Sequence, residues 1–187
     1  MKFDPRVKVE NNKLYEISSN KEIDTQNIDF INAADIKEDT FFSSKTALTA
    51  VNVGWADVEM EPGSYNEELL ANLRNYLKKV EEAGSYAFII AKAGKELADA
   101  DEADTFIKAM VHTARRIKDA ESVVGFSLAD ELVEKDEGGE FDENSYSQWF
   151  INDMNVKHGH YVYFAKQDLL KIKGLLGKGI CSNLVLF

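Results

Sequence analysis

The stretch Ser122-Val123-Val124-Gly125-Phe126-Ser127-Leu128-Ala129-Asp130-Glu131 runs without a break from an apolar segment into two acidic residues. A continuous apolar segment of this length is typical of a strand that is covered on both faces. Residues 86–91 (Tyr-Ala-Phe-Ile-Ile-Ala) show the same pattern, and residues 101–117, between the two segments, carry apolar side chains at helical spacing. Strand, helix and strand in this order predict a parallel βαβ unit.

The rest of the chain continues this alternation on both sides of that unit. Residues 7–10 and 13–17 have the pattern of a hairpin around the turn-forming pair Asn11-Asn12. Further strands are expected at residues 28–34, 48–55, 161–165 and 180–187, and further helices at residues 64–83, 146–154 and 169–176. We therefore predict one α/β domain over residues 1–187, with a hairpin lead-in over 1–27 and βα units over 28–187.

Local signals suggest where two of the helices begin and end. Ser64 with Glu67 three residues later has the pattern of a capping box, and Gly84 stands where a C-terminal glycine belongs. For the helix at residues 101–117, Asp101 or Asp104 is the expected N-cap.

Composition narrows the range of functions. The 187 residues include 22 Lys and Arg and 33 Asp and Glu, which gives a net charge of −11. Such an excess of negative charge disfavours binding to nucleic acid or to an acidic membrane surface, and the sequence has no apolar run long enough to span a bilayer. Cys181 is the only cysteine, so the chain cannot form an internal disulfide. The sequence does not fix the cellular compartment. Between an extracellular and a cytoplasmic location, we expect the extracellular one.

Two motifs and the opening hairpin resemble one enzyme family. Trp55-Ala56-Asp57-Val58-Glu59-Met60-Glu61-Pro62-Gly63-Ser64-Tyr65-Asn66 resembles the stretch after the second barrel strand of the cellulase-like TIM-barrel glycoside hydrolases (glycoside hydrolase family 5 and its clan). The segment that ends at Glu131 resembles the fourth strand of that family, and the hairpin resembles its lead-in. The resemblance covers residues 7–135 in the correct order. It implies a TIM-barrel-like (β/α) domain.

The resemblance also implies a site. Glycoside hydrolysis uses two carboxyl groups that flank the scissile bond, and Glu131 takes the place of the family's general acid/base. A carboxyl group at the C-terminal end of a barrel strand points into the mouth of the active site. The expected sugar-binding residues are Asp130, Trp55, Asp57 and Asn32, and the expected ligand is an oligo- or polysaccharide with β-linkages. No cofactor is expected.

The sequence departs from the family pattern at several positions. Asp130 replaces an Asn, Leu132 replaces a Pro, the family's Arg falls at Ala50 or Asn52, and its His falls at Lys92 or Ala93. No residue matches the nucleophile of the seventh strand. A full barrel needs ~250 residues, so this chain has room for about five to six βα units.

Three hypotheses follow from the shortened length and the departures. The chain is a glycoside hydrolase-like enzyme, a non-catalytic carbohydrate-binding relative, or a truncated barrel fragment that self-associates. An open barrel leaves unpaired strand edges, and residues 180–187 are apolar, so the sequence predicts a homodimer or a higher assembly. The alternative is that the N-terminal hairpin or a helix fills the gap within one chain.

The other motifs that could form binding sites are better explained as parts of the fold, such as turns, helix ends and solvated loops. His158-Gly159-His160 lacks a nearby third metal ligand, Gly174-Leu175-Leu176-Gly177-Lys178-Gly179 lacks the spacing of a phosphate loop, and the acidic residues 99–102 and 136–140 lack the spacing of a calcium loop. Cys181 is expected in the core. No metal site is predicted.

Overall fold

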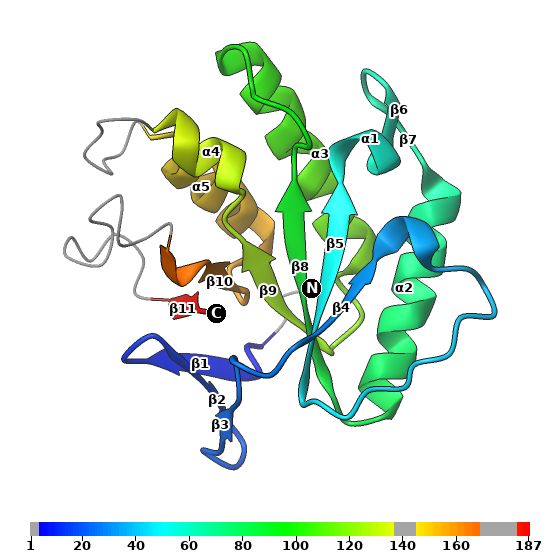
Figure 1. Ribbon diagram of the computed structural model, residues 1–187, viewed down its shortest axis with the longest axis vertical. Coiled ribbons are helices and arrows are strands. Elements are labelled where there is room, and N and C mark those ends of the chain that lie inside the picture. The colour runs from blue at the N-terminus through cyan, green and yellow to red at the C-terminus, as the bar shows by residue number, and fades with distance from the viewer. Residues whose placement is uncertain (1–3, 137–144, 169–182) are drawn as a thin grey trace.

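The computed structural model describes residues 4–136, 145–168 and 183–187. Its centre is a sheet of six parallel strands in the order β11-β10-β9-β8-β5-β4 (Figure 1). These strands are β4 (Asp29–Asn32), β5 (Leu48–Gly54), β8 (Tyr86–Lys92), β9 (Val123–Ser127), β10 (Val162–Ala165) and β11 (Leu184–Leu186). The sheet confirms the prediction of a shortened, TIM-barrel-like α/β fold with an N-terminal hairpin.

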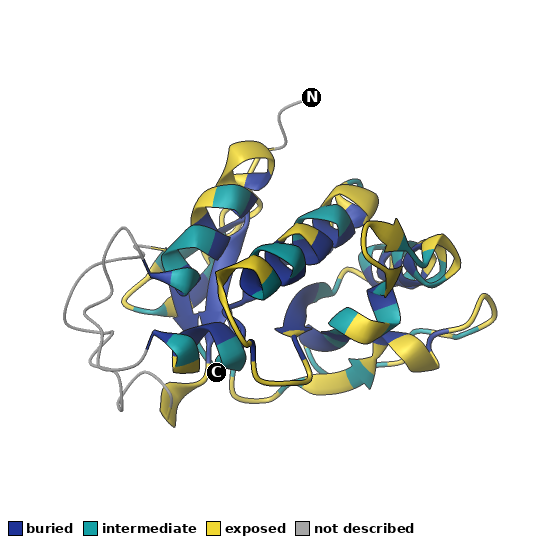
Figure 2. Ribbon diagram, turned by 90° about the horizontal axis from the view of Figure 1, so that it is seen from above, coloured by how far each residue is buried: buried dark blue, intermediate teal, exposed yellow. Residues whose placement is uncertain are grey.

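Three helices cover one face of the sheet, which we call the outer face. They are α2 (Glu67–Glu82), α3 (Ala100–Ile117) and α5 (Tyr146–His158). Their apolar residues form one core with outward-facing strand residues such as Val51, Ile89 and Phe126. Figure 2 shows the exposed residues of these helices on the side turned away from the sheet.

The helix boundaries agree with the predictions, but the caps differ. Asn66 caps α2 by accepting a hydrogen bond from the Leu69 N–H at 3.1 Å, and Asp99 caps α3 through the Glu102 N–H at 2.9 Å. The predicted capping box at Ser64 is wrong, because Ser64 belongs to β7 (Ser64–Tyr65), which pairs with β6 (Glu59–Glu61) in a small hairpin. Gly84 follows α2 with a φ of +70°, as a C-terminal glycine does.

A second, three-stranded sheet covers part of the opposite face, which we call the inner face. It consists of β1 (Val7–Glu10), β2 (Lys13–Glu16) and the unpredicted β3 (Glu22–Ile23). Leu14 and Ile23 of this sheet pack with Phe88 and Phe164 of the central sheet. Figure 1 shows this hairpin sheet below the central strands, at their amino ends.

The hairpin sheet also covers the edge strand β11. The Leu186 N–H donates to the Asn12 carbonyl at 3.3 Å, the Asn12 side chain donates to the Leu184 carbonyl at 3.0 Å, and the Thr25 hydroxyl donates to the Leu186 carbonyl at 3.0 Å. The hairpin sheet therefore covers this edge within one chain, and the oligomeric state stays a prediction.

The other edge of the sheet is formed by β4. Among the described residues, no strand pairs with β4 on the side away from β5. Residues 28–34 were expected to form a buried strand, but Phe30 is 60% exposed and Asp29 and Asn32 are exposed as well. The expectation of burial fails because β4 lies at the edge, where a seventh or eighth barrel strand would cover it.

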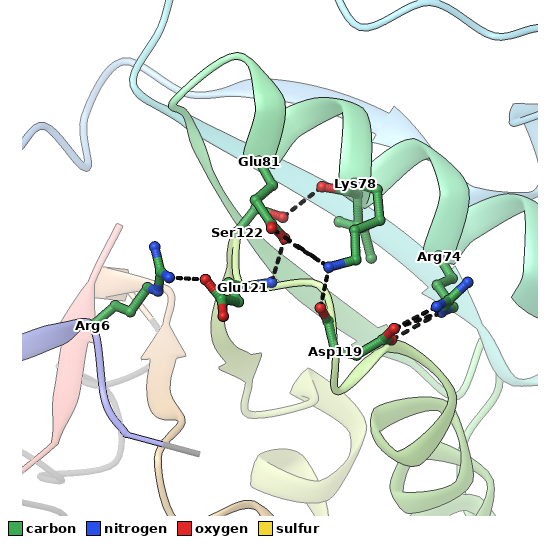
Figure 3. A network of polar contacts seen from close by, with 8 residues as sticks. Arg6, Arg74, Lys78, Glu81, Asp119, Glu121 and Ser122 are labelled. Atoms are coloured by element: carbon green, nitrogen blue, oxygen red, sulfur yellow. Dashed lines mark hydrogen bonds and ion pairs between the residues drawn. The ribbon is translucent and has the colours of Figure 1, made fainter.

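A polar network ties the loop before β9 to its surroundings at the amino end of the sheet (Figure 3). Arg74 of α2 donates to Asp119 at 2.9 Å, and the Glu121 N–H donates to Glu81 at 2.7 Å. Arg6, just before β1, forms an ion pair with Glu121. The network joins α2, the loop and the N-terminal segment at one end of the sheet.

Some predictions concern residues outside the described ranges. They include the helix at 169–176, the glycine-rich segment 174–179, part of the final strand, and Cys181. Within the described ranges, no helix is both long enough and apolar enough to cross a membrane.

Candidate functional site

The carboxyl end of the central sheet gathers the residues that the sequence singled out. Asn32 ends β4, Trp55 follows β5, and Asp130 and Glu131 follow β9 after two residues. Because all six strands are parallel, these positions lie at one end of the sheet. Asn32, Asp130 and Glu131 each form a polar contact with a residue at or just after a neighbouring strand.

Glu131 lies in the first turn of the short helix α4 (Asp130–Lys135). Its carboxylate accepts a hydrogen bond from the Gly94 N–H at 2.8 Å, just after the neighbouring strand β8. The side chain lines an open cavity of about 440 Å³ together with Glu96, Leu97, Glu134 and Lys135. Lys135 donates to the Leu97 carbonyl at 2.8 Å and so holds α4 against the loop after β8.

Asp130 faces a different neighbour. Its carboxylate forms an ion pair with Lys166, which directly follows β10. Lys166 continues the alternation of Val162 and Phe164, whose side chains lie on the inner face. Asp130 is therefore tied toward β10, whereas Glu131 is tied toward β8. At the start of α4, the consecutive residues Asp130 and Glu131 therefore contact the strand ends on opposite sides of β9.

Trp55 follows β5 and begins the short helix α1 (Trp55–Val58). Its ring already contacts other side chains of the protein. The indole N–H donates to Glu59, the ring lies 5.9 Å from that of Phe106 on α3, and Lys95 lies 4.9 Å from the indole centroid. The predicted stacking of a sugar on Trp55 would have to displace Lys95 or use the ring's remaining surface.

Asn32 is linked to the next strand by its side chain. The Asn52 amide donates to the Asn32 side-chain oxygen at 3.2 Å, and the Asn32 amide donates to Asp35 at 2.9 Å. Asp57 of α1 lies above the end of β5, where a Cβ on Gly54 would come within 2.6 Å of the Asp57 carboxylate. Gly54 thus allows Asp57 its close approach to the strand.

The structure brings some of the predicted residues together and separates others. Glu131 contacts Gly94 and Trp55 contacts Lys95, so both adjoin the loop after β8. The cavity beside Glu131 is not lined by Trp55. Sequence reasoning missed Lys166 and Gly94; Lys166 could have been found from its position directly after the predicted strand 161–165.

Strand alternation shows which of the residues proposed for the family's Arg and His positions face inward. Asn52 and Lys92 continue the inward alternation of Ala50 and Phe88, whereas Ala93 packs in the core on the outer face. Ala50 is buried in the part of the inner face that the hairpin sheet covers. Asn52 and Lys92 are therefore the side chains that face the position of a barrel interior.

The histidine motif lies at the opposite end of the molecule. His158 ends α5, is 2% exposed and stacks on Tyr161 with ring centroids 5.6 Å apart. Burial is the main cause that lowers the pKa of His158 to about 4, and His160, Lys118 and Lys157 add to it. Among the described residues, no group of three or more His, Cys, Asp or Glu side chains is arranged to hold a metal ion.

The fold is that of the cellulase-like TIM-barrel glycoside hydrolases, in a shortened form. The chain is similar to an endogalactoceramidase, with a TM-score of 0.63 and 10% identity over 97% of this chain and 59% of that one. It is also similar to endo-glycoceramidase II from Rhodococcus sp. (TM-score 0.56, 12% identity, 87% of this chain and 51% of that one). A third similar structure is an endocellulase from the archaeon Pyrococcus horikoshii (0.53, 10%, 85% and 56%).

At these identities the similarity establishes the fold. The chain spans between half and three-fifths of the length of these three structures. No protein-family model matches the chain, and no curated protein sequence does either.

Proposed function

We propose that this protein binds β-linked glycans at the carboxyl end of its sheet, with Glu131 in the position of the acid/base and with weak or no hydrolytic activity. The observation that carries the proposal is the placement of Glu131: it follows a central parallel strand, borders an open cavity and is held by the Gly94 N–H. A general acid has to reach its substrate from a fixed position. The structural neighbours, an endogalactoceramidase, an endo-glycoceramidase and an endocellulase, support a glycan as the ligand.

We expect weak hydrolysis because no residue matches the family's nucleophile and because Glu134 and Asp130, two of the three carboxylates nearest Glu131 in sequence or in the cavity, are poorly placed to act as the second group. The reaction needs two carboxyl groups on opposite sides of the scissile bond. Glu134 lies one helical turn from Glu131 on α4, so the two line one wall of the cavity, and Asp130 is paired with Lys166. Glu96 is the lining carboxylate that comes from another element, the loop after β8.

The test separates binding from turnover. Binding of cellohexaose and mannohexaose is measured by calorimetry, and hydrolysis is followed on soluble β-glucan and β-mannan. We expect wild type to bind at least one hexasaccharide, and Glu131→Gln to bind within about twofold of it because the neutral side chain keeps its shape and its acceptor oxygen. Glu38→Gln, at an exposed acid far along the chain from the cavity residues, is the control.

Two outcomes would change the proposal. Absence of binding by wild type to both hexasaccharides would overturn it. Robust turnover that Glu131→Gln abolishes would show an active enzyme, and a parallel loss in Glu96→Gln would then identify the second carboxylate.

Self-association is a second candidate function, and the open edge of β4 favours it. Exposed strand edges pair readily with other strands, and Phe30 adds an exposed apolar side chain there. The edge at β11, where the sequence predicted pairing, is covered by Asn12 and Thr25. The mass in solution, measured by light scattering, tests this candidate.

A further inference from the structure

The inner face of the sheet changes character between its two ends. Near the amino ends, Phe88 and Phe164 are covered by the hairpin sheet. Toward the carboxyl ends, Asn32 of β4 and Asn52 of β5 lie on this face, and Phe30 lies on it two residues before Asn32, level with Ala50. Ile31 packs on the opposite, helix-covered side, so strand alternation places Phe30 and Asn32 inward.

These three side chains are neighbours across the two strands. Phe30 is in register with the inward-facing Ala50, and Asn32 is in register with Asn52. Residues two apart on a strand share a face, so the ring and the two amides form one continuous patch. Phe30 is 60% exposed.

The amides are held in place by hydrogen bonds that leave part of their capacity unused. Asn52 donates to Asn32, and Asn32 donates to Asp35. Each amide has two N–H donors and an oxygen that accepts two bonds. One N–H of each amide and the Asn52 oxygen thus stay available to hydroxyl groups, as counted over the described residues.

An exposed aromatic ring beside oriented amides has the chemistry that recognises a sugar. The ring covers the apolar C–H face of a pyranose, while the amides bond its hydroxyl groups. Phe41 is more exposed, at 87%, but an isolated exposed aromatic needs no explanation of this kind. Trp55, the residue expected to stack on the sugar, already contacts Glu59, Phe106 and Lys95.

We infer that Phe30, Asn32 and Asn52 form a platform for one pyranose ring of the bound glycan; this inference rests on the proposed function. β4 and β9 are separated by β5 and β8, so the platform lies about three strand spacings, ~14 Å, from the strand that leads to Glu131. One sugar ring cannot cover that distance. The ligand is therefore an oligosaccharide, and the platform binds a ring remote from the one beside Glu131.

The experiment measures dissociation constants for cellohexaose, mannohexaose, glucose and mannose with the whole chain. Phe30→Ala is expected to weaken hexasaccharide binding about tenfold, and Phe30→Trp to keep it within about twofold because a ring face remains. Asn52→Ala is expected to weaken it about fivefold. Phe41→Ala is the matched control and should bind like wild type, and the two monosaccharides should bind at least tenfold more weakly than the hexasaccharides.

The outcomes separate this inference from the function on which it rests. If wild type binds a hexasaccharide and Phe30→Ala binds it equally well, the platform is wrong and the proposed function stands. If wild type binds neither hexasaccharide, both the platform and the proposed function are wrong. If light scattering without sugar shows a dimer that Phe30→Ala converts to a monomer, Phe30 belongs to an interface between copies, and the platform is overturned.

Discussion

The amino and carboxyl ends of one parallel sheet differ sharply in this molecule. At the amino end, the inner face is apolar and covered, and the network around Asp119 and Glu121 ties the loop before β9 to its neighbours. At the carboxyl end, the inner face is polar and open, and its side chains are linked in small groups, such as Asn52, Asn32 and Asp35, or Asp130 and Lys166. The change occurs within single strands: in β5 it falls between Ala50 and Asn52. The contrast teaches that the two ends of one sheet can differ in role: the covered amino end stabilises the fold, while the carboxyl end is where the proposed glycan site lies.

The largest effect is expected at the covered end. Phe88 is fully buried and stacks on Phe164 with ring centroids 4.0 Å apart. Phe88→Ala would remove a ring from the contact between the hairpin sheet and the central sheet, and should cost about 3–5 kcal/mol of unfolding free energy. Urea unfolding followed by circular dichroism measures this. Phe41→Ala is the exposed control, and an equal effect of both variants would break the comparison.

An intermediate effect depends on pH and also belongs to the amino end. The pKa of His158 is lowered in the folded chain from an ordinary value of 6.5 to about 4. Between these pH values the imidazole of His158 binds a proton in the unfolded chain but not in the folded chain. The unfolding free energy is therefore highest above pH 6.5, as far as His158 is concerned, and it falls as the pH drops toward 4. The expected loss is about 2–3 kcal/mol.

Urea midpoints measured between pH 7.5 and 4 test this dependence. His158→Phe removes the titrating group, so its stability should fall less with acid than that of wild type. Burial also lowers the pKa of His112 and of His160, which act in the same direction and remain in the variant. Parallel curves for wild type and His158→Phe would contradict the assignment.

The smallest effect on stability is expected at the open end. Asn52→Ala removes an exposed hydrogen bond to Asn32 at 3.2 Å and should change the unfolding free energy by less than about 0.5 kcal/mol. The same urea experiment measures it. A loss above about 2 kcal/mol would show that the carboxyl end also holds the fold, and would erase the difference between the two ends.

The sequence predicted most of the fold because its strongest signals are local. The apolar segments at residues 86–91 and 123–128 became central strands, and Asn11-Asn12 forms the hairpin turn with φ of +53° and +61°. The missed elements, such as β3 and α4, are too short to show a period. The capping error arose because Ser64 and Glu67 match the capping-box pattern, whereas Asn66, two residues after Ser64, caps the helix in the folded chain.

The candidate site was harder to predict because its contacts join distant parts of the chain. Position after the strand at residues 123–128 marked Asp130 and Glu131 as carboxyl-end residues, and both follow β9 in the structure. It could not show that the Trp55 ring lies on Phe106, 51 residues away, or that Phe30 is exposed. The exposure of Phe30 depends on which strands stand beside β4, and strand order is a property of the whole sheet.

The cover on β11 has a consequence for the order in which the chain folds. The Asn12 side chain binds the Leu184 carbonyl across 172 positions, and the Thr25 hydroxyl binds that of Leu186 across 161. Contacts between such remote partners carry the greatest loop-closure entropy and form late. On the ribosome, the hairpin sheet is synthesised well before β11 and can pair with this strand only after the residues between them have emerged. Until then its apolar residues and the growing sheet edge stay open to other chains.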